Sequence, residues 1–464
     1  MNTLLSNTLS ESKSKRTTLL CLLYFCQGVP WGFATIALLA TLSEAGHSRT
    51  ETATVVALAV LPWTFKFIWA PLIDSLRAPT LGLRRPWIAF AQLCMAITLL
   101  AAWTNGGLES SATLTHLAWV FFVHNCFASL QDVATDALAV DLLEDEERGR
   151  VNGLMWSSSL FGVAVGGAGM ATIAAWYGLP TAILVQVGLL LSVFALVICW
   201  REHPGDRLFP WSPGTAHASV KAPSPGIVFT LRELKRALSL RTTLMLVAVA
   251  STRGISEGIY DPVTTEFFVQ ELGWPAERLA QSQGTLGLMG ELAGALLGGY
   301  LCDRFGQRLI AVIGMVGALI TLLTFSLTSD SWSQPGYMHV LLLPAFRGFS
   351  AFATVAMFSL YMKVSWTAVA ATQFTMYMAL SNIGYAFGVQ LNSWLPLAGY
   401  DLTFADAYLL AGVVPVLPLL LIFTFDPNGA EKHKLADRAL GGSTSKVPAA
   451  ATINPLGGPG PMIG

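Results

Sequence analysis

Charged side chains occur within stretches of this sequence that are otherwise apolar. Asp132 and Asp136 stand four residues apart in one such stretch, so on a helix they share a face. An ionisable group near the centre of a bilayer costs about 2.5 kcal/mol or more and usually faces a partner or a wet cavity. Burial and a like-charged neighbour both favour the protonated form of a carboxylate, so this pair is a candidate for taking up and releasing a proton. The alternative is a static ion pair with Lys66 or Arg150.

A second polar stripe recurs at helical spacing. Arg253, Glu257 and Asp261 follow one another every four residues and therefore lie on one helix face. Such a stripe either lines a cavity or is satisfied by salt bridges along the helix. Pro262 directly follows it and predicts a kink.

Three further residues complete the set of candidate ligand contacts. Lys66 can pair with Asp132, bind an anionic group of a ligand, or reach the membrane surface with its long side chain. Arg347 lies between a proline and a glycine and is a candidate clamp for an anion. Tyr377 belongs to a polar set for which packing is the more common role. The predicted substrate-binding residues are Lys66, Arg253, Glu257, Asp261, Arg347 and Tyr377.

The composition explains which kind of element carries these charges. Of 464 residues, 53% are hydrophobic and 12% are charged, whereas a soluble domain has about 25% charged residues. With a mean hydropathy of +0.57, the chain could not cover a soluble surface of this size. The net charge of −1 argues against a nucleic-acid partner. The six cysteines show no metal-ligand spacing, so we expect no metal and no disulfide framework.

The charged residues fall within predicted membrane helices. A membrane helix needs about 20 mostly apolar residues, and twelve stretches meet this length approximately. The predicted spans are 17–42, 52–73, 87–103, 115–140, 151–177, 179–200, 241–268, 279–301, 309–328, 338–362, 367–396 and 403–425.

The distribution of basic residues predicts the orientation. If the N-terminus is cytoplasmic, the inner segments hold 22 of the 27 lysines and arginines, and the outer loops hold only Arg49 and Arg278. Such an excess on one side is typical of cytoplasmic loops. We therefore expect both termini in the cytoplasm.

The chain divides into two blocks of six spans. Between them lies a linker with several prolines and basic residues, in which 230–240 is predicted to form a short amphipathic helix on the membrane surface. The final segment is rich in Gly, Pro, Ala and Ser and is predicted to be disordered. The predicted organisation is an N-terminal segment (1–16), a six-helix bundle (17–200), the linker (201–240), a second six-helix bundle (241–426) and a tail (427–464).

The loop after the eighth span resembles a signature of the major facilitator superfamily. Residues 299–308 read GYLCDRFGQR, which is similar to the superfamily pattern G-x-x-x-D-R-x-G-x-R. Gly299 allows close helix approach and Gly306 a tight turn. Asp303 is expected near a helix terminus, paired with Arg308 or with an arginine across a gate that opens and closes.

The corresponding loop of the first block is degenerate. It has Asp74 and, after an insertion, Arg84 and Arg85, but it lacks the glycine before the aspartate. The resemblance implies an all-α polytopic membrane protein of the major facilitator fold, with twelve transmembrane helices in two six-helix halves. The predicted cytoplasmic gate residues are Asp74, Arg84, Arg85, Gly299, Asp303, Arg304, Gly306 and Arg308.

Three stretches resemble one branch of the superfamily, the peptide/acetyl-coenzyme-A/drug transporters. Residues 23–30 read LYFCQGVP, residues 62–74 read PWTFKFIWAPLID, and residues 131–141 read QDVATDALAVD. These match the patterns LYFxQGxP, P-x-x-x-K-x-x-W-[AS]-P-x-x-D and Q-D-x-x-x-D-x-x-x-x-D. The branch includes muropeptide permeases, acetyl-CoA transporters and siderophore importers.

The resemblance implies a secondary active transporter, a proton-coupled importer of a mid-sized polar or anionic solute by alternating access. A muropeptide-like solute is favoured over a siderophore. The phosphate-binding pattern G-x-x-x-x-G-K-[ST] is absent, which argues against an ATP site. A non-transporting receptor and an intramembrane enzyme are remote alternatives, because Tyr260-Asp261 is only half of an aspartyl-protease motif. We therefore expect no enzyme activity and no cofactor. The expected partners are a small-molecule substrate, protons and the lipid bilayer, for a monomer in a bacterial inner membrane.

Overall fold

The computed structural model describes most of the two predicted bundles. It covers residues 8–38, 65–76, 80–103, 111–214, 226–328, 338–366, 369–400 and 402–424, with a few positions between 42 and 63. The described secondary structure is helical, apart from isolated bridge residues, among them the pair Thr8 and Arg201. The predicted disordered tail lies outside the described residues.

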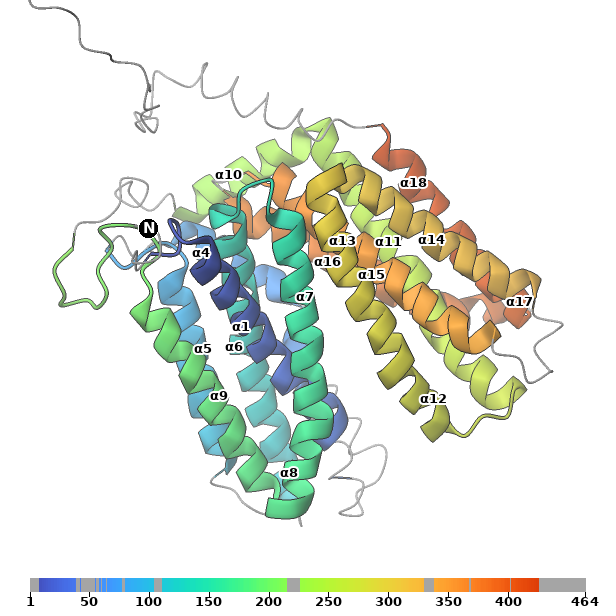
Figure 1. Ribbon diagram of the computed structural model, residues 1–464, viewed down its shortest axis with the longest axis horizontal. Helices are drawn as coiled ribbons and strands as arrows, with labels where there is room; N and C mark the ends of the chain where they lie inside the picture. Colours follow the sequence, from blue (N-terminus) through green and yellow to red (C-terminus); the bar gives the residue numbers. More distant parts are fainter. Residues whose placement is uncertain are drawn as a thin grey trace, which may run out of the picture.

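The first block forms one helical group (Figure 1). Its elements are α1 (Lys13–Gly32), η2 (Phe33–Ala37), η3 (Lys66–Ile68), α4 (Trp69–Ser75), α5 (Arg85–Trp103), α6 (Ser111–Leu142), α7 (Arg148–Ala164), η4 (Val165–Gly169), α8 (Met170–Tyr177) and α9 (Leu179–Cys199). The second predicted span is described only in part, with η3 and α4 at its C-terminal end.

The second block forms the other group. Its elements are α11 (Arg241–Glu266), η5 (Phe267–Glu271), α12 (Ala276–Ser282), η6 (Gln283–Gly287), α13 (Leu288–Phe305), α14 (Gln307–Leu327), α15 (Met338–Val364), α16 (Ala370–Leu397), α17 (Phe404–Val413) and α18 (Val416–Ile422). From the third span onward, the helix ends lie within four residues of the predicted boundaries.

Length and composition are consistent with membrane crossing. Seven of the described helical segments are apolar and long enough to span a bilayer. Helices α6, α11 and α16 are of similar length, at 32, 26 and 28 residues, but their polar side chains lower the hydropathy. These three helices carry most of the residues predicted to contact a ligand.

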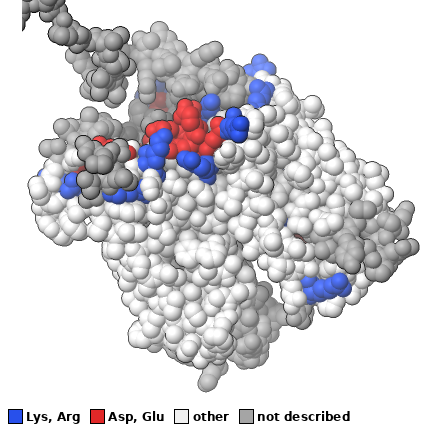
Figure 2. Space-filling view, viewed as in Figure 1, with Lys and Arg blue, Asp and Glu red and all other residues white. Residues whose placement is uncertain are grey.

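The two groups converge at one end and diverge toward the other (Figure 1). The convergent end carries the N-terminal part of the described chain and the linker helix α10 (Gly226–Ser239). Most charged side chains visible in Figure 2 also gather there, and we call it the charged end. The residues that position the candidate site therefore lie along helices that start or finish at this end.

Helix α10 confirms that the linker contains a helix, which starts four residues earlier than predicted. Its Thr230 hydroxyl lies 3.2 Å from the Ser75 hydroxyl at the end of α4. After α10 the chain enters α11 directly at Arg241. The helix thus contacts the first group and leads covalently into the second. Its location on a membrane surface stays a prediction.

The segment after α9 folds back on the start of α5. The Glu202 carboxylate accepts hydrogen bonds from the backbone N–H groups of Arg84 and Arg85, at 2.9 and 3.1 Å. Beside it, burial disfavours the charged form of His203. A hydrogen bond to Asp206 and the charges of Glu202 and Asp206 outweigh this, so the pKa of His203 is raised above its usual value.

This raised pKa predicts how the segment responds to pH. The folded pKa of His203 exceeds the unfolded value of about 6.5. Protonation of His203 therefore stabilises the folded segment 201–206, and this contribution is fully present below about pH 6.5. The contribution is lost as pH rises through the folded pKa. We expect backbone amide exchange at residues 201–206, corrected for its intrinsic pH dependence, to accelerate as the pH rises above about 6.5 and through the folded pKa of His203. The His203→Gln variant should show no such step, and an equal step in the variant would contradict the assignment.

Candidate functional site

A cavity lies at mid-length of the helices, where the two groups meet. Its volume is about 170 Å³. One wall residue comes from the first group, Trp156 on α7, and the others come from α11, α13, α15 and α16. The lining residues are Trp156, Arg253, Glu257, Glu291, Arg347, Ser350, Ala351, Thr354, Phe358, Met378, Ser381 and Asn382.

The predicted stripe on α11 both lines this cavity and pairs along its own helix. Arg253 Nη1 lies 3.2 Å from Glu257 Oε1. The Arg253 guanidinium also donates to Thr354 Oγ1 at 2.9 Å and to Ser381 Oγ at 3.0 Å. The Ser350 hydroxyl donates to the Glu257 carboxylate. The stripe therefore both lines a cavity and forms a salt bridge along its helix, because the Arg253–Glu257 pair is only partly buried.

The third member of the stripe pairs with the predicted anion clamp. Arg347 Nη2 lies 2.8 Å from Asp261 Oδ1, and the Tyr385 hydroxyl donates to Asp261 Oδ2 at 2.9 Å. The side chains of Arg347 and Asp261 are 31% and 26% exposed, so a ligand can reach this pair. Helix α11 continues through Pro262 to Glu266.

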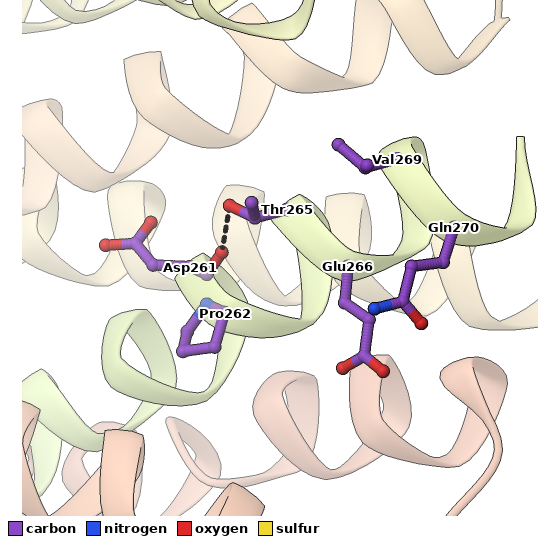
Figure 3. A pocket seen from close by; sticks show the side chains of 6 residues that line it. All are labelled: Asp261, Pro262, Thr265, Glu266, Val269 and Gln270. Carbon is purple, nitrogen blue, oxygen red and sulfur yellow. Dashed lines mark hydrogen bonds between the residues drawn. The ribbon is translucent and has the colours of Figure 1, made fainter. Parts of the chain in front are cut away.

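Asp261 also belongs to a wider pocket on the side away from the charged end. This pocket has a volume of about 800 Å³ and is lined by Asp261, Pro262, Thr265, Glu266, Val269 and Gln270. All six lie on α11 and η5, and the Asp261 carboxylate points away from Glu266 (Figure 3). The Arg347–Asp261 pair thus lies where the wider pocket meets the central cavity.

The first group contributes a buried ion pair beside the cavity. Lys66 Nζ lies 2.8 Å from Asp132 Oδ2, and the two residues are 3% and 4% exposed. Lys66 Nζ also approaches Met378 Sδ at 3.8 Å, and Met378 lines the cavity. A single side chain of the second group therefore separates this pair from the ligand space.

Asp136 does not share the lysine with Asp132. Its Oδ1 accepts a hydrogen bond of 2.5 Å from the Tyr24 hydroxyl on α1. Its Oδ2 is buried and has no hydrogen-bond partner among the described residues. Of the two partners predicted for an ion pair, Lys66 pairs with Asp132, whereas Arg150 lies at the start of α7 and forms no salt bridge with either carboxylate. The two carboxylates share a helix but have different surroundings.

Tyr377 is placed differently from the prediction. Its side chain is fully buried, accepts a hydrogen bond of 2.8 Å from Gln373 Nε2, and stacks on Tyr361 with ring centroids 4.9 Å apart. It is not among the residues that line the cavity. Its ring faces α15 because that side of α16 packs inside the second group.

Sequence reasoning missed one ionisable residue of the cavity. Glu291 on α13 lines it and accepts a hydrogen bond of 3.2 Å from Trp156 Nε1 on α7. The signal was available, since Glu291 is a carboxylate inside a predicted span, the same pattern that singled out Asp132. Trp156 carried no comparable signal.

At the charged end, two aspartates connect the groups. Asp303 of the second group accepts hydrogen bonds from the backbone N–H groups of Gly149 and Arg150 at 2.7 and 2.9 Å, which caps the start of α7. Asp74 of the first group accepts from the backbone N–H and the hydroxyl of Thr372, both at 2.8 Å, near the start of α16. A negative charge is favourable at a helix N-terminus. Each half thus holds the start of a helix of the other.

The arginines of the predicted gate divide into two kinds. Arg84 pairs with Asp74 at 2.9 Å and with Asp141 at 2.8 Å. Arg85 instead donates to backbone carbonyls of its own half, including those of Val197 and Leu208.

The expected pairing of Asp303 with Arg308 is not seen. Arg304 lies over the Phe305 ring and Arg308 over the Phe423 ring, at 5.5 and 5.3 Å from the ring centroids. Both arginines contact rings of their own half, and Gly306, with φ of 91°, ends α13 and turns the chain before Arg308.

Close helix approach seals the charged end behind these aspartates. A Cβ atom on Gly299 would lie 2.6 Å from the Gly149 carbonyl oxygen, and one on Gly153 would lie 2.5 Å from the Ala295 carbonyl oxygen. Real Cβ atoms do not approach backbone atoms so closely. Helices α7 and α13 are therefore packed backbone to backbone, as the glycine in the signature loop predicts.

Comparisons with known proteins agree with this architecture. The family model of the Major Facilitator Superfamily matches residues 20–389 and 246–453. The anhydromuropeptide permease of Escherichia coli strain K12 is 26% identical over 413 residues, which cover 88% of this chain and 79% of that protein.

Two solved structures have a similar fold. One is a bacterial homologue of the iron transporter ferroportin in an outward-facing state, with a TM-score of 0.66 at 14% identity, covering 88% of this chain and 98% of that chain. The other is the transporter FucP in the outward conformation, with a TM-score of 0.66 at 15% identity and the same coverage. The chain therefore belongs to the Major Facilitator Superfamily and is a multi-pass membrane transporter for a small-molecule substrate, not an enzyme.

Proposed function

We propose that this transporter imports a muropeptide-like solute, a sugar linked to a short peptide, by proton-coupled alternating access. The observation that carries the proposal is the mixed-charge cavity at mid-length, closed toward the charged end and adjoining a wider pocket on the other side. The similarity to an anhydromuropeptide permease over 88% of the chain supports the substrate class.

The proposed orientation places the charged end and both termini in the cytoplasm. Cytoplasmic segments of membrane proteins carry an excess of lysine and arginine, as the predicted inner segments do. With the Asp74 and Asp303 contacts made on that side, the described conformation is outward-facing. Import then requires these contacts to break while the outer ends of the halves approach each other. We further propose that the protein works as a monomer in a bacterial inner membrane.

The charges of the cavity favour one class of solute over the others. Arg253 and Arg347 each already pair with a carboxylate, and Glu291 adds a third negative charge. A polyanion such as a CoA thioester or a carboxylate siderophore would meet more negative than positive groups. A solute with both a carboxylate and an ammonium group finds partners for both, as a sugar-peptide would.

Proton coupling is proposed for Asp132 and Asp136. Protonation of Asp132 would leave the Lys66 ammonium without its partner, so Lys66 would be free to contact a solute carboxylate beyond Met378. The Lys66–Asp132 pair would thus couple the two events, because a proton on Asp132 releases Lys66 to bind the solute. Asp136 would exchange its proton through the Tyr24 hydroxyl.

Transport into proteoliposomes tests the proposal. The liposomes contain a pH-sensitive dye and receive an anhydromuropeptide, a carboxylate siderophore or acetyl-CoA outside. We expect uptake of the anhydromuropeptide with acidification of the lumen, and at most a tenth of that rate for the two polyanions. Uptake without a proton flux would overturn the proposed coupling. Uptake of the siderophore alone would mean that the substrate is a siderophore and not a muropeptide-like solute.

A further inference from the structure

Three carboxylates lie in the cavity or where it meets the wider pocket, and they are not equivalent. Glu257 pairs with Arg253 on its own helix, and Asp261 pairs with Arg347. Glu291 forms no salt bridge among the described residues, although its side chain lines the same cavity. Its carboxylate accepts a hydrogen bond from a neutral donor, the indole N–H of Trp156. Glu291 is therefore the cavity carboxylate whose charge has no cation bound directly to it.

A positively charged amine is the ligand group that would satisfy this carboxylate. A hydrogen bond between an ammonium and a carboxylate is shorter and about twice as strong as one between neutral groups. The indole N–H is neutral, so an ammonium competes favourably with it for a Glu291 oxygen. The surrounding groups suit an amine too, since Ser350 and Asn382 supply polar atoms and Trp156 and Phe358 supply aromatic rings.

We infer that Glu291 is the binding site for an ammonium group of the substrate, and that its bond to Trp156 links substrate binding to closure of the charged end. The inference rests on the proposed transport function and specifies the chemistry of its substrate. Glu291 on α13 would bind the ammonium group, whereas the carboxylates of α11 are already paired with arginines.

The link to closure follows from where Trp156 lies. Trp156 belongs to α7, the helix whose start Asp303 caps and whose glycines pack against α13. Its bond to Glu291 is one of the contacts that hold the two halves together on this side of the cavity. An ammonium that takes over the Glu291 oxygen removes this contact. Substrate binding therefore weakens the closed arrangement of the charged end, which an importer must open next.

The test compares two ligands on three proteins. One ligand is an anhydromuropeptide whose peptide contains a diamino acid with a free amine, and the other is the same compound acetylated on that amine. The proteins are the wild type, Glu291→Gln and Glu271→Gln. Glu271 is a matched control, since it is exposed at the end of η5 and lines neither the cavity nor the wider pocket.

We expect Glu291→Gln to raise the KM of the free-amine ligand at least about tenfold, the usual effect of losing a charge-assisted hydrogen bond. The KM of the acetylated ligand should stay within about twofold of the wild-type value, and Glu271→Gln should behave as the wild type. Equal losses for both ligands would show a structural role for Glu291 and overturn the inference. An unchanged KM for the free-amine ligand would overturn it as well.

A measurement on the wild type alone keeps the inference testable if Glu291→Gln does not fold. The free-amine ligand should compete for uptake at least about tenfold more strongly than its acetylated form. Equal competition would refute an ammonium site while leaving muropeptide transport intact. Failure of both ligands to be transported would instead refute the proposed function.

The Trp156→Phe variant tests the link to the gate. Phenylalanine keeps an aromatic ring against Phe358 but removes the indole N–H. We expect the free-amine ligand to bind this variant more tightly, because no donor has to be displaced, while the acetylated ligand is unaffected. A lower KM confined to the free-amine ligand supports competition at Glu291, and no difference between the ligands contradicts it.

Discussion

Replacing Asp132 by asparagine is expected to abolish proton-driven accumulation of substrate. The carboxylate lies 2.8 Å from the Lys66 ammonium, and both residues are nearly inaccessible. Removing one partner of a buried ion pair leaves an uncompensated charge, at a cost of about 3–5 kcal/mol. The Asp132→Asn variant should therefore lose both the proton carrier and the group that holds Lys66, with accumulation reduced at least about 100-fold. Lumenal acidification in proteoliposomes measures the loss.

A double variant separates proton coupling from simple destabilisation. Lys66→Gln combined with Asp132→Asn removes both charges and restores a neutral, hydrogen-bonding pair. We expect this protein to be produced as well as the wild type and to stay unable to accumulate substrate against a gradient. Recovery of accumulation in the double variant would mean that the pair is static, with the proton carried by another group such as Asp136.

The sequence was sufficient to predict the helices but not the direction in which their side chains point. Twelve spans and the major facilitator fold followed from the length of apolar stretches and from the loop around Asp303, and both are confirmed. The position of Asp303 beside a helix terminus was also anticipated. Of the two partners expected for Asp303, Arg308 is wrong, because after the turn at Gly306 it lies over Phe423. The other, an arginine across the gate, is represented by Arg150, which contributes its backbone N–H.

The composition of the candidate site was harder to predict than the fold. The residue types on α11 identified the stripe, but the partner of Asp261 lies 86 residues away on α15 and depends on how the two helices are rotated. The same rotation turns Tyr377 into the packed interior. Glu291 had a recognisable pattern and could have been found. Tyr24 could not, because a tyrosine in an apolar span gives no sign that it will donate to a carboxylate.

Roles in transport remain predictions for all these residues, but their arrangement limits the possibilities. The ion pairs of the cavity lie within one half each, whereas the Trp156–Glu291 bond and the Asp74 and Asp303 caps cross between halves. Opening of the charged end breaks the contacts that cross between the halves and leaves the ion pairs within each half intact. The contacts that determine the conformational equilibrium are therefore the crossing ones, together with the glycine packing of α7 on α13.

Replacing Gly153 by leucine should prevent the charged end from closing. A Cβ atom there would lie 2.5 Å from the Ala295 carbonyl oxygen and 3.2 Å from Gly299 Cα, so backbone atoms would have to move apart. Overpacking of this kind costs about 1–3 kcal/mol even where side chains can adjust. A cost near 3 kcal/mol lowers the ratio of closed to open protein about 100-fold. We expect transport to fall by a similar factor, with the protein held open on the charged side.

Labelling of Cys302 distinguishes an open charged end from a misfolded protein. This thiol is fully buried between α13 and α7 in the closed arrangement. In a protein whose five other cysteines are serine, a membrane-impermeant maleimide should label Cys302 in Gly153→Leu but not in the parent. Gly188→Leu is the matched control, because nothing lies within 4 Å of a Cβ at Gly188. Retained transport with a protected Cys302 would show that α7 and α13 need not pack closely for closure.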